Sequence, residues 1–324
     1  MIPNQWYAIL ESDQIRRGRL TGVTRMGEKL VAWRDGAGTA HIMGDRCPHR
    51  GAAFSAGKLT GECVQCPFHG FEFDPRGACT LIPANGRAAT PPKAMRAQAY
   101  ETREAHGLVY IWWGEPRASY PPLPFFDNLP DRLAYVTFRD PWPVHYSRAI
   151  ENQLDVLHLP FVHHNTIGAG GQTVVHGPVV CERELAPGSW LLEAWLDNEL
   201  DHGQVARKPS EMPAPTGRPL IQFHYPNVWQ LWLGDDVRVF VAFAPVDDAN
   251  TLVYARQYHS FTIPGLRQVA DLFSLFSTFI ILRQDKDVVI TQRPIRSDLK
   301  MDEILVPGDL PIILYRKRRQ ALMQ

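Results

Sequence analysis

Two cysteine–histidine pairs lie close together in the first part of the chain. Cys47-Pro48-His49 is followed by Cys66-Pro67-Phe68-His69, so each short loop offers one thiolate and one imidazole. Thiolates bind iron–sulfur clusters and zinc, and imidazole suits both kinds of site. The four side chains therefore predict either a [2Fe–2S] cluster, with two cysteines on one iron and two histidines on the other, or a single zinc ion.

The spacing of these ligands favours the cluster. Zinc knuckles usually space their ligands as Cys-x₂₋₄-Cys and His-x₃₋₅-His. Here each loop carries one residue of each type, and Cys-x-His is unusual for zinc. We therefore predict a Rieske [2Fe–2S] cluster bound by Cys47, His49, Cys66 and His69, with zinc as the alternative. Neutral histidine ligands raise the reduction potential of such a cluster.

A second group follows the pattern Asp155-x-x-His158-x₄-His163. Non-haem Fe(II) enzymes bind iron on one face with two histidines and one carboxylate, which leaves positions open for O₂ and substrate. His158 and His163 would lie about 140° apart on an ideal helix. Pro160 biases Leu159 away from the helix, so we expect the helix to end there and both histidines to converge on one ion. Asp155 is a candidate partner of His158 or a route out of the site.

The two groups carry a family resemblance. Residues 5 to 115, with the runs CPHRGAAFSAG and CPFHGFEFDPRGAC, resemble the Rieske domain of ring-hydroxylating and demethylating oxygenases. The run 151–164 resembles the iron-binding motif of the same family. The resemblance implies that His158 and His163 bind iron. It also implies that Asp155 is a catalytic carboxylate, which bridges an iron-bound histidine to the cluster of the neighbouring subunit.

The third iron ligand should be a carboxylate far along the chain. The run Gln284-Asp285-Lys286-Asp287 offers two, and the apolar residues on nearly every side of this segment do not decide between them. Asp285 matches the family position, so the resemblance implies Asp285 as the ligand, with Asp287 as the alternative. Asn152 matches a polar residue near iron in some demethylases of the group. A role for His164 in the pocket and a surface position both remain open.

Composition limits the partners that we expect. Lys plus Arg and Asp plus Glu number 34 each, so no overall field favours nucleic acid or an anionic membrane. The N-terminus lacks a basic region followed by an apolar run, so we expect no signal peptide and a cytoplasmic protein. The most apolar stretch, 269–282, is too short to span a bilayer and predicts a buried helix. The chain has neither a dinucleotide-binding fingerprint nor a P-loop. We therefore expect its electrons to come from NAD(P)H through a separate reductase or ferredoxin.

The elements that must position these side chains form two domains. We expect a Rieske domain over 1–115, a proline-rich linker over 116–130 and a catalytic iron domain over 131–324. The pattern predicts an α+β fold: an all-β N-terminal domain, then an antiparallel sheet with a long helix, which the resemblance implies is a helix-grip fold. Predicted strands span 29–33, 39–43, 108–113, 190–196, 228–233, 237–244 and 252–258. Predicted helices span 145–159, 266–292 and 312–323.

The resemblance implies a function. We expect the terminal oxygenase component of a multi-component system, carrying a [2Fe–2S] cluster and Fe(II). Its reaction is O₂-dependent hydroxylation or oxidative demethylation of an aromatic or other apolar small molecule, by a mono- or dioxygenase. The chain length is more typical of the homotrimeric members than of those with a second subunit type. Two other classes stay open, an electron-transfer protein without iron chemistry and a zinc-stabilised binding module.

Overall fold

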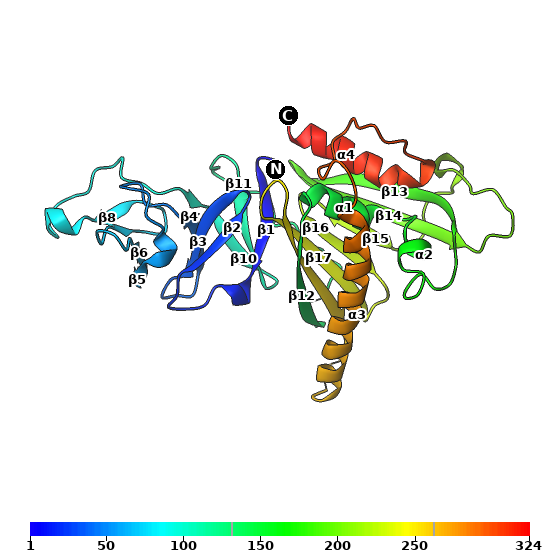
Figure 1. The fold of residues 1–324 in the computed structure, drawn as a ribbon, viewed down its shortest axis with the longest axis horizontal. Coiled ribbons are helices and arrows are strands. Elements are labelled where there is room, and N and C mark those ends of the chain that lie inside the picture. The colour runs from blue at the N-terminus through cyan, green and yellow to red at the C-terminus, as the bar shows by residue number, and fades with distance from the viewer. Residues whose placement is uncertain (131, 262) are drawn as a thin grey trace. The chain divides into compact units, whose positions relative to one another are not determined.

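The computed structural model describes residues 1–324 except residues 131 and 262. It divides into two compact units, one of Asn4–Ala118 and one of Met1–Pro3 with Ser119–Gln324 (Figure 1). Residue 131, the predicted first residue of the catalytic domain, lies outside the described residues.

The N-terminal unit consists of three small antiparallel sheets. Apolar runs form its inner strands, and Leu30 to Trp33 are fully buried. The first sheet has the order β1 (Gln5–Glu11), β11 (Leu108–Trp113), β10 (Thr102–Ala105). The second has the order β2 (Thr21–Arg25), β3 (Glu28–Arg34), β4 (Ala40–Gly44), β9 (Ala99–Tyr100). The third has the order β5 (Lys58–Thr60), β6 (Cys63–Gln65), β7 (Glu72–Phe73), β8 (Cys79–Leu81).

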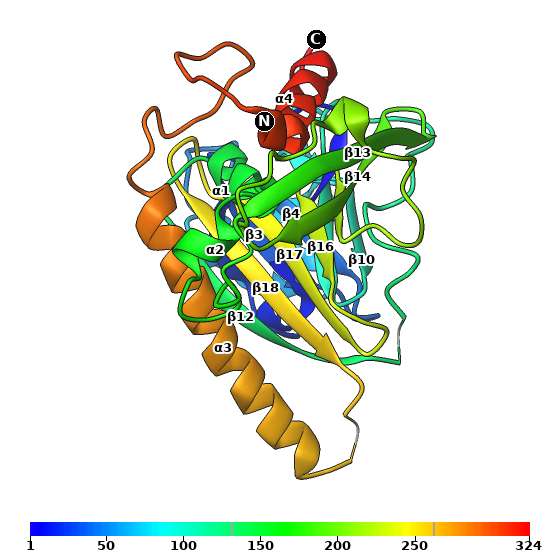
Figure 2. The ribbon, with the colours of Figure 1, turned by 90° about the vertical axis from the view of Figure 1, so that its right-hand side faces the viewer.

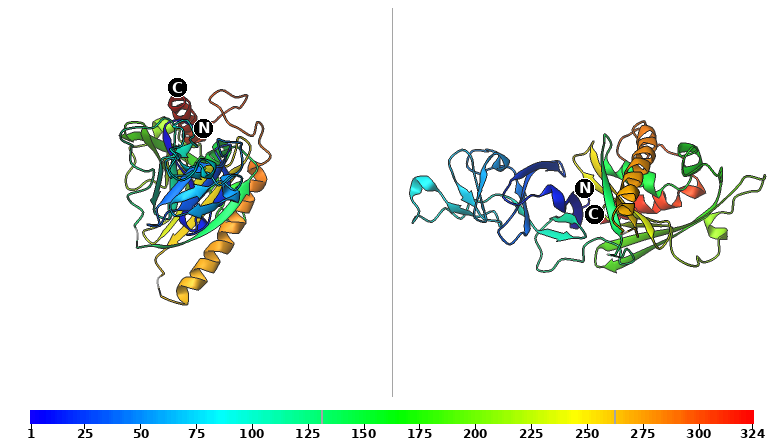
Figure 3. Two further views of the ribbon diagram at one scale, coloured as in Figure 1. Left: turned by 90° about the vertical axis from the view of Figure 1, so that its left-hand side faces the viewer. Right: turned by 90° about the horizontal axis from the view of Figure 1, so that it is seen from below.

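Over its described residues, the C-terminal unit is one seven-stranded antiparallel sheet with four helices. Figures 2 and 3 show the helices beside this sheet. The strand order is β12 (Ala134–Trp142), β18 (Thr251–His259), β17 (Val237–Pro245), β16 (Val228–Trp232), β15 (Ile221–His224), β14 (Ser189–Glu199), β13 (Val174–Ala186). The helices are α1 (Tyr146–Leu154), α2 (Leu159–Val162), α3 (Leu266–Val289) and α4 (Leu310–Leu322). Helix α3 packs against β12 and β18, and α4 packs against β13 and β14. The predicted α+β fold class is confirmed.

The predicted strands all form, but the sequence analysis missed several others. In the C-terminal unit the missed strands are β12, β13 and β15. Strands β12 and β13 are the two edges of the sheet. The second half of β13 carries charged residues such as Glu182 and Arg183, which suit a solvent-facing edge and hide the apolar alternation of an ordinary strand.

The predicted helix over 145–159 is wrong beyond Leu154. Helix α1 ends at Leu154, because Asp155 takes an extended conformation with φ −70° and ψ 127°. A separate short helix, α2, begins after His158 and has Pro160 in its first turn. Proline is well tolerated there because the first N–H groups of a helix have no partner inside it. Pro160 therefore starts a helix rather than ending one.

Helix α3 departs from the predicted burial. It forms over nearly the predicted range and ends at Val289 rather than residue 292. Five large apolar side chains between residues 269 and 282 are exposed by 47–70%: Val269, Leu272, Phe273, Phe276 and Phe279. The prediction of a buried helix is therefore wrong for this part of α3 in the single chain. Among the described residues, no helix is long and apolar enough to cross a membrane.

Candidate metal centres

The two cysteine–histidine loops have the same backbone design. The amide of Gly51 donates to the carbonyl of Cys47, and the amide of Gly70 donates to the carbonyl of Cys66. Both glycines have positive φ, 76° and 72°, a region that side-chain-bearing residues rarely adopt. Each cysteine amide also donates across its loop, to Ala52 and to Phe71. Two tight turns thus present their thiols and imidazoles in equivalent ways.

The thiols of the two loops lie together and buried, while the imidazoles are exposed. Cys47 is 1% exposed and Cys66 2%. Burial raises the pKa of Cys47 to about 11, and the neighbouring Cys66 raises it further while backbone amides of the loop oppose this. The rings of His49 and His69 lie with centroids 4.8 Å apart. The structure therefore pairs thiol with thiol and imidazole with imidazole.

This pairing fits a two-iron cluster better than a single zinc ion. Zinc needs all its ligand atoms around one point, at about 2.0 to 2.3 Å from the metal. Over the part of the chain that the structure describes, only one group of His, Cys, Asp or Glu gathers its ligand atoms within 4.8 Å of one another, and it is not this group. Two cysteines at one end and two histidines at the other are the ligand set of a Rieske cluster.

The group that does converge is His158, His163 and Asp285. The two histidines flank α2, and Asp285 lies on α3, which packs beside α2 (Figure 2). Oδ1 of Asp285 lies 3.5 Å from Nε2 of His158 and 3.0 Å from Nε2 of His163. Asp285 and His163 are 2% and 1% exposed. Two imidazoles and a carboxylate on one face match the ligand set of a non-haem Fe(II) site.

Gln284 fixes which nitrogen of His163 is available. Its Oε1 lies 2.9 Å from Nδ1 of His163 and also accepts from Oγ1 of Thr166, while its Nε2 donates to Asn165. The amide oxygen therefore faces the ring, so Nδ1 donates and Nε2 presents a lone pair to Asp285. Such outer partners orient metal-bound histidines. Nothing in the spacing of the sequence motifs indicates this role for Gln284.

The facing lone pairs indicate a cation site. Oδ1 of Asp285 is buried and has no hydrogen-bond partner, although Nε2 of His163 lies close by. Burial alone would lower the pKa of His163, but the adjacent Asp285 carboxylate and the amide oxygen of Gln284 outweigh burial and raise this pKa. A positive charge between the ring and the carboxylate would stabilise this contact, and a metal ion would supply that charge. Gln153, whose Nε2 donates to Oδ2 of Asp285 over 3.2 Å, orients the carboxylate and was also missed.

Asp155 lies next to this site but is not part of it. Its Oδ2 is 3.8 Å from Nδ1 of His158, beyond hydrogen-bond distance, and its Oδ1 accepts from the amide of Leu157. Nδ1 of His158 is buried and has no hydrogen-bond partner. The Asp155 side chain is 29% exposed. Asp155 thus stands between an iron-site histidine and solvent, where a neighbouring molecule can reach it.

Three further candidate residues lie outside the convergent group: Asp287, Asn152 and His164. Asp287 is 57% exposed and pairs with Arg283 on the surface of α3, so it does not join the convergent group. The Nδ2 atom of Asn152 is buried and has no hydrogen-bond partner. His164 is exposed, and its Nδ1 lies 2.9 Å from the carbonyl of Phe161.

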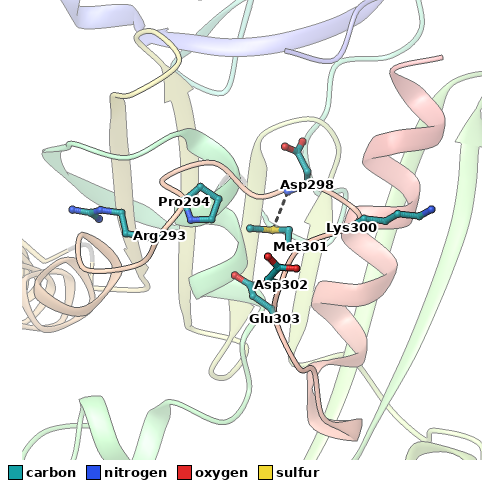
Figure 4. A pocket seen from close by; sticks show the side chains of 7 residues that line it. All are labelled: Arg293, Pro294, Asp298, Lys300, Met301, Asp302 and Glu303. Carbon is teal, nitrogen blue, oxygen red and sulfur yellow. Dashed lines mark hydrogen bonds between the residues drawn. The ribbon is translucent and has the colours of Figure 1, made fainter.

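A cavity of about 460 Å³ lies elsewhere in the C-terminal unit (Figure 4). It is lined by Arg293, Pro294, Asp298, Lys300, Met301, Asp302 and Glu303. Glu303 ion-pairs with the buried guanidinium groups of Arg148 and Arg316, each over 2.7 Å. No predicted metal ligand lines this cavity. The loop that carries Glu303 is instead bound by ion pairs to Arg148 on α1 and Arg316 on α4.

Two family profiles match the chain. The family described as Rieske [2Fe–2S] domain matches residues 5–92. The family described as vanillate O-demethylase oxygenase C-terminal domain matches residues 142–324, more than half of the chain. The first match covers both cysteine–histidine loops, and the second covers His158, His163 and Asp285.

Individual relatives agree with the profiles. Protein TIC 55 of Arabidopsis thaliana is 32% identical over 50% of this chain and 30% of its own length. The toluene-4-sulfonate monooxygenase iron–sulfur subunit TsaM1 of Comamonas testosteroni is 30% identical over 61% of this chain and 56% of its own length. The chain thus spans less than two thirds of these two relatives. Methylxanthine N1-demethylase NdmA of Pseudomonas putida is 26% identical over 93% of this chain and 80% of its own length.

Solved structures show the same fold. NdmA with caffeine matches with a TM-score of 0.73 at 22% identity, over 97% of this chain and 89% of that one. The oxygenase in an oxygenase–ferredoxin complex of carbazole 1,9a-dioxygenase matches with a TM-score of 0.77 at 18% identity, over 98% of this chain and 88% of that one. Together with the family profiles and the two ligand groups, these matches show that the chain belongs to the Rieske oxygenase family.

Proposed function

We propose that this chain is the terminal oxygenase component of a multi-component Rieske system. The observation that carries the proposal is the convergence of His158, His163 and Asp285 in a unit separate from the cluster loops. In this proposal Cys47, Cys66, His49 and His69 bind the [2Fe–2S] cluster, and the convergent group binds Fe(II). When bound, the cluster supplies electrons and Fe(II) supplies open positions for O₂ and substrate.

The protein's own contribution is to hold and orient. Gln284 and Gln153 fix the ring of His163 and the carboxylate of Asp285, so the ligand atoms point at one place before metal binds. The contact with Gln284 keeps Nε2 of His163 free for the ion. An electron-transfer protein would have no need of this buried triad, which argues against that class.

The substrate class and the partners are part of the proposal. We expect hydroxylation or oxidative demethylation of an aromatic or other apolar small molecule. The names of the relatives support this choice, since they include a methylxanthine demethylase, a toluene-4-sulfonate monooxygenase and a carbazole dioxygenase. A separate reductase or ferredoxin that draws on NAD(P)H supplies electrons, as the similarity to the oxidoreductase NdmD and the solved ferredoxin complex suggest. Neither nucleic acid nor a membrane is a partner.

We further propose a cytoplasmic homotrimer in which Asp155 links the two metal sites of neighbouring subunits. Phe68, beside the cluster histidines, is 55% exposed, and Phe161, beside the iron histidines, is 66% exposed. A head-to-tail contact would cover both, and such contacts close into rings when the rotation permits. The domain limits in this proposal remain 1–115, 116–130 and 131–324.

Product analysis tests the function. The purified chain, loaded anaerobically with iron and supplied with a surrogate ferredoxin, reductase and NADH, would be given aromatic compounds and aromatic methyl ethers or N-methyl compounds. We expect O₂-dependent consumption of at least one compound, with a hydroxylated product or with formaldehyde and the demethylated product. The His163→Ala variant is the control for background oxidation. If a loaded protein with a reducible cluster turns over no compound faster than this variant, the oxygenase proposal is wrong.

A further inference from the structure

Helix α3 has an inverted distribution of side chains in its N-terminal half. The side that faces the sheet is polar: Asp271 contacts Nε2 of His259 over 2.8 Å, and Ser274 is only 6% exposed. The hydroxyls of Ser277 and Thr278 both donate to Oε1 of Gln257 on β18. A surface helix normally does the opposite, placing its apolar side on the sheet and its polar side in water.

Large apolar side chains occupy the outward side. We call these residues the outer stripe: Leu266, Val269, Leu272, Phe273, Phe276 and Phe279, exposed by 55%, 65%, 68%, 70%, 64% and 47%. Figures 1 and 2 both show this half of α3 projecting beyond the sheet. Leu266, Val269, Phe273 and Phe276 follow one another at intervals of three and four residues. That spacing is the seam along which two helices pack.

The outer stripe is large for the surface of a monomer. A phenylalanine presents roughly 150 to 250 Å², so its three phenylalanines alone expose about 300 Å². With the leucines and the valine, the stripe reaches about 600 Å², the upper end of the range of apolar patches on monomers. It would supply most of the roughly 800 Å² that each partner buries in a standard-sized protein interface.

The lack of charge on the outer stripe indicates which kind of partner binds it. No charged side chain belongs to it, and the adjacent arginines are neutralised on the helix itself, Arg267 by Asp271 and Arg283 by Asp287. An electron donor has to leave after each transfer, and such encounters have small interfaces. A lipid surface would require unpaired basic residues beside the apolar ones. A surface without charge that carries the seam spacing is complementary to itself, as a two-fold contact requires.

We propose that the outer stripe of α3 is a self-association surface, on which a second copy of this chain packs its own outer stripe about a two-fold axis. This contact is separate from the head-to-tail contact at Asp155 and does not depend on oxygenase activity. Together, the two contacts would give an assembly with an even number of subunits, such as two rings joined through α3.

Sedimentation velocity of the Phe273→Ser/Phe276→Ser variant tests the proposal. The wild-type chain should sediment as an even-numbered assembly, and the variant should dissociate into halves. Each lost phenylalanine should raise the dissociation constant at least about tenfold. The matched control is Val205→Ser/Ile304→Ser, two apolar residues that are 90% and 98% exposed outside the stripe, and it should keep the wild-type assembly. Cluster absorbance and far-ultraviolet circular dichroism should be the same in all three proteins.

Crosslinking tests the same contact without weakening it. In a Cys181→Ser background, Phe273→Cys should form a covalent dimer with a short bis-maleimide, because a stripe residue lies near its own copy across a two-fold axis. The Val205→Cys control should give only background dimer. A wild-type chain that is monomeric or odd-numbered, or a Phe273→Cys chain that crosslinks no better than the control, would overturn the proposal. A wild-type chain that is monomeric or odd-numbered and that also binds lipid vesicles would assign the outer stripe to a membrane surface instead.

Discussion

The two metal-binding regions of this chain are built in opposite ways. The proposed cluster ligands come from two short loops with matching backbone hydrogen bonds, and their imidazoles face solvent. The proposed iron ligands come from the α2 segment and from α3, far apart in sequence, and His163 and Asp285 are almost completely buried. The first region can offer its histidines to another molecule, whereas the second keeps its ligands enclosed by the sheet and helices.

This difference indicates which side chains each site depends on. At the cluster, the loop backbone does the positioning, so few side chains beyond the four ligands matter for binding. At the iron site, side chains do the positioning: Gln284 holds His163, and Gln153 holds Asp285. Substitutions of the side chains that orient the iron ligands should therefore act on metal binding, and substitutions at the exposed edges of the two sites should act on electron passage.

The largest effect is expected for Asp285→Ala. Losing one of three ligands should remove the mononuclear iron and reduce turnover to background, while the cluster spectrum stays unchanged because the two sites share no ligand. Metal analysis and visible absorption would measure both. Asp287→Ala, which removes an exposed surface ion pair, should behave like the wild type. The reverse pattern in the two variants would mean that Asp287 is the ligand.

Asp155→Asn should have the next largest effect, and it concerns the connection between the two sites. The variant keeps the shape but removes the charge near Nδ1 of His158. We expect both metals to load, while reoxidation of the pre-reduced cluster in the presence of substrate and O₂ slows by roughly 100-fold. Stopped-flow absorption would follow this rate. Unchanged reoxidation would show that Asp155 has only a structural role and that electrons cross elsewhere.

Gln284→Ala tests whether a side chain that orients His163 contributes to iron binding. Without the acceptor for Nδ1 of His163, the affinity for Fe(II) should fall by roughly 10- to 100-fold, with the cluster intact. Anaerobic titration of the iron-depleted chain would measure it. Gln292→Ala, an exposed glutamine beyond the end of α3, is the matched control. Equal affinities in the two variants would remove Gln284 from the account of the site.

The smallest effect is expected at the exposed cluster region, for Phe68→Ala. The Phe68 ring lies over His69 with centroids 3.9 Å apart and is more than half exposed. We expect full metal content and only a few-fold slower cluster reoxidation, because apolar contact area with the neighbouring subunit is lost. Loss of the cluster itself would show that Phe68 protects the iron rather than contributing to docking.

The sequence predicts local features of the two sites better than features that depend on contacts between distant segments. The cluster loops are local, so Cys47, His49, Cys66 and His69 could be proposed as ligands from spacing alone, and this assignment stays a prediction. Asp285 could not be chosen over Asp287 from periodicity, because the outer stripe makes α3 apolar on the side that is normally polar. Gln284 and Gln153 act through contacts that only the folded chain creates. The break between α1 and α2 was missed because Pro160 was expected to end a helix, although proline also suits a first turn.

Quantifying metals and sulfide in the anaerobically purified chain tests whether it carries both a cluster and a mononuclear iron. We expect about three irons and two acid-labile sulfides per chain, little zinc and a reddish-brown protein, because four Cys and His ligands would hold a two-iron cluster and His158, His163 and Asp285 would hold one further ion. Electron paramagnetic resonance of the dithionite-reduced protein should show a Rieske-type signal. A colourless protein with one zinc per chain and no labile sulfide would contradict it.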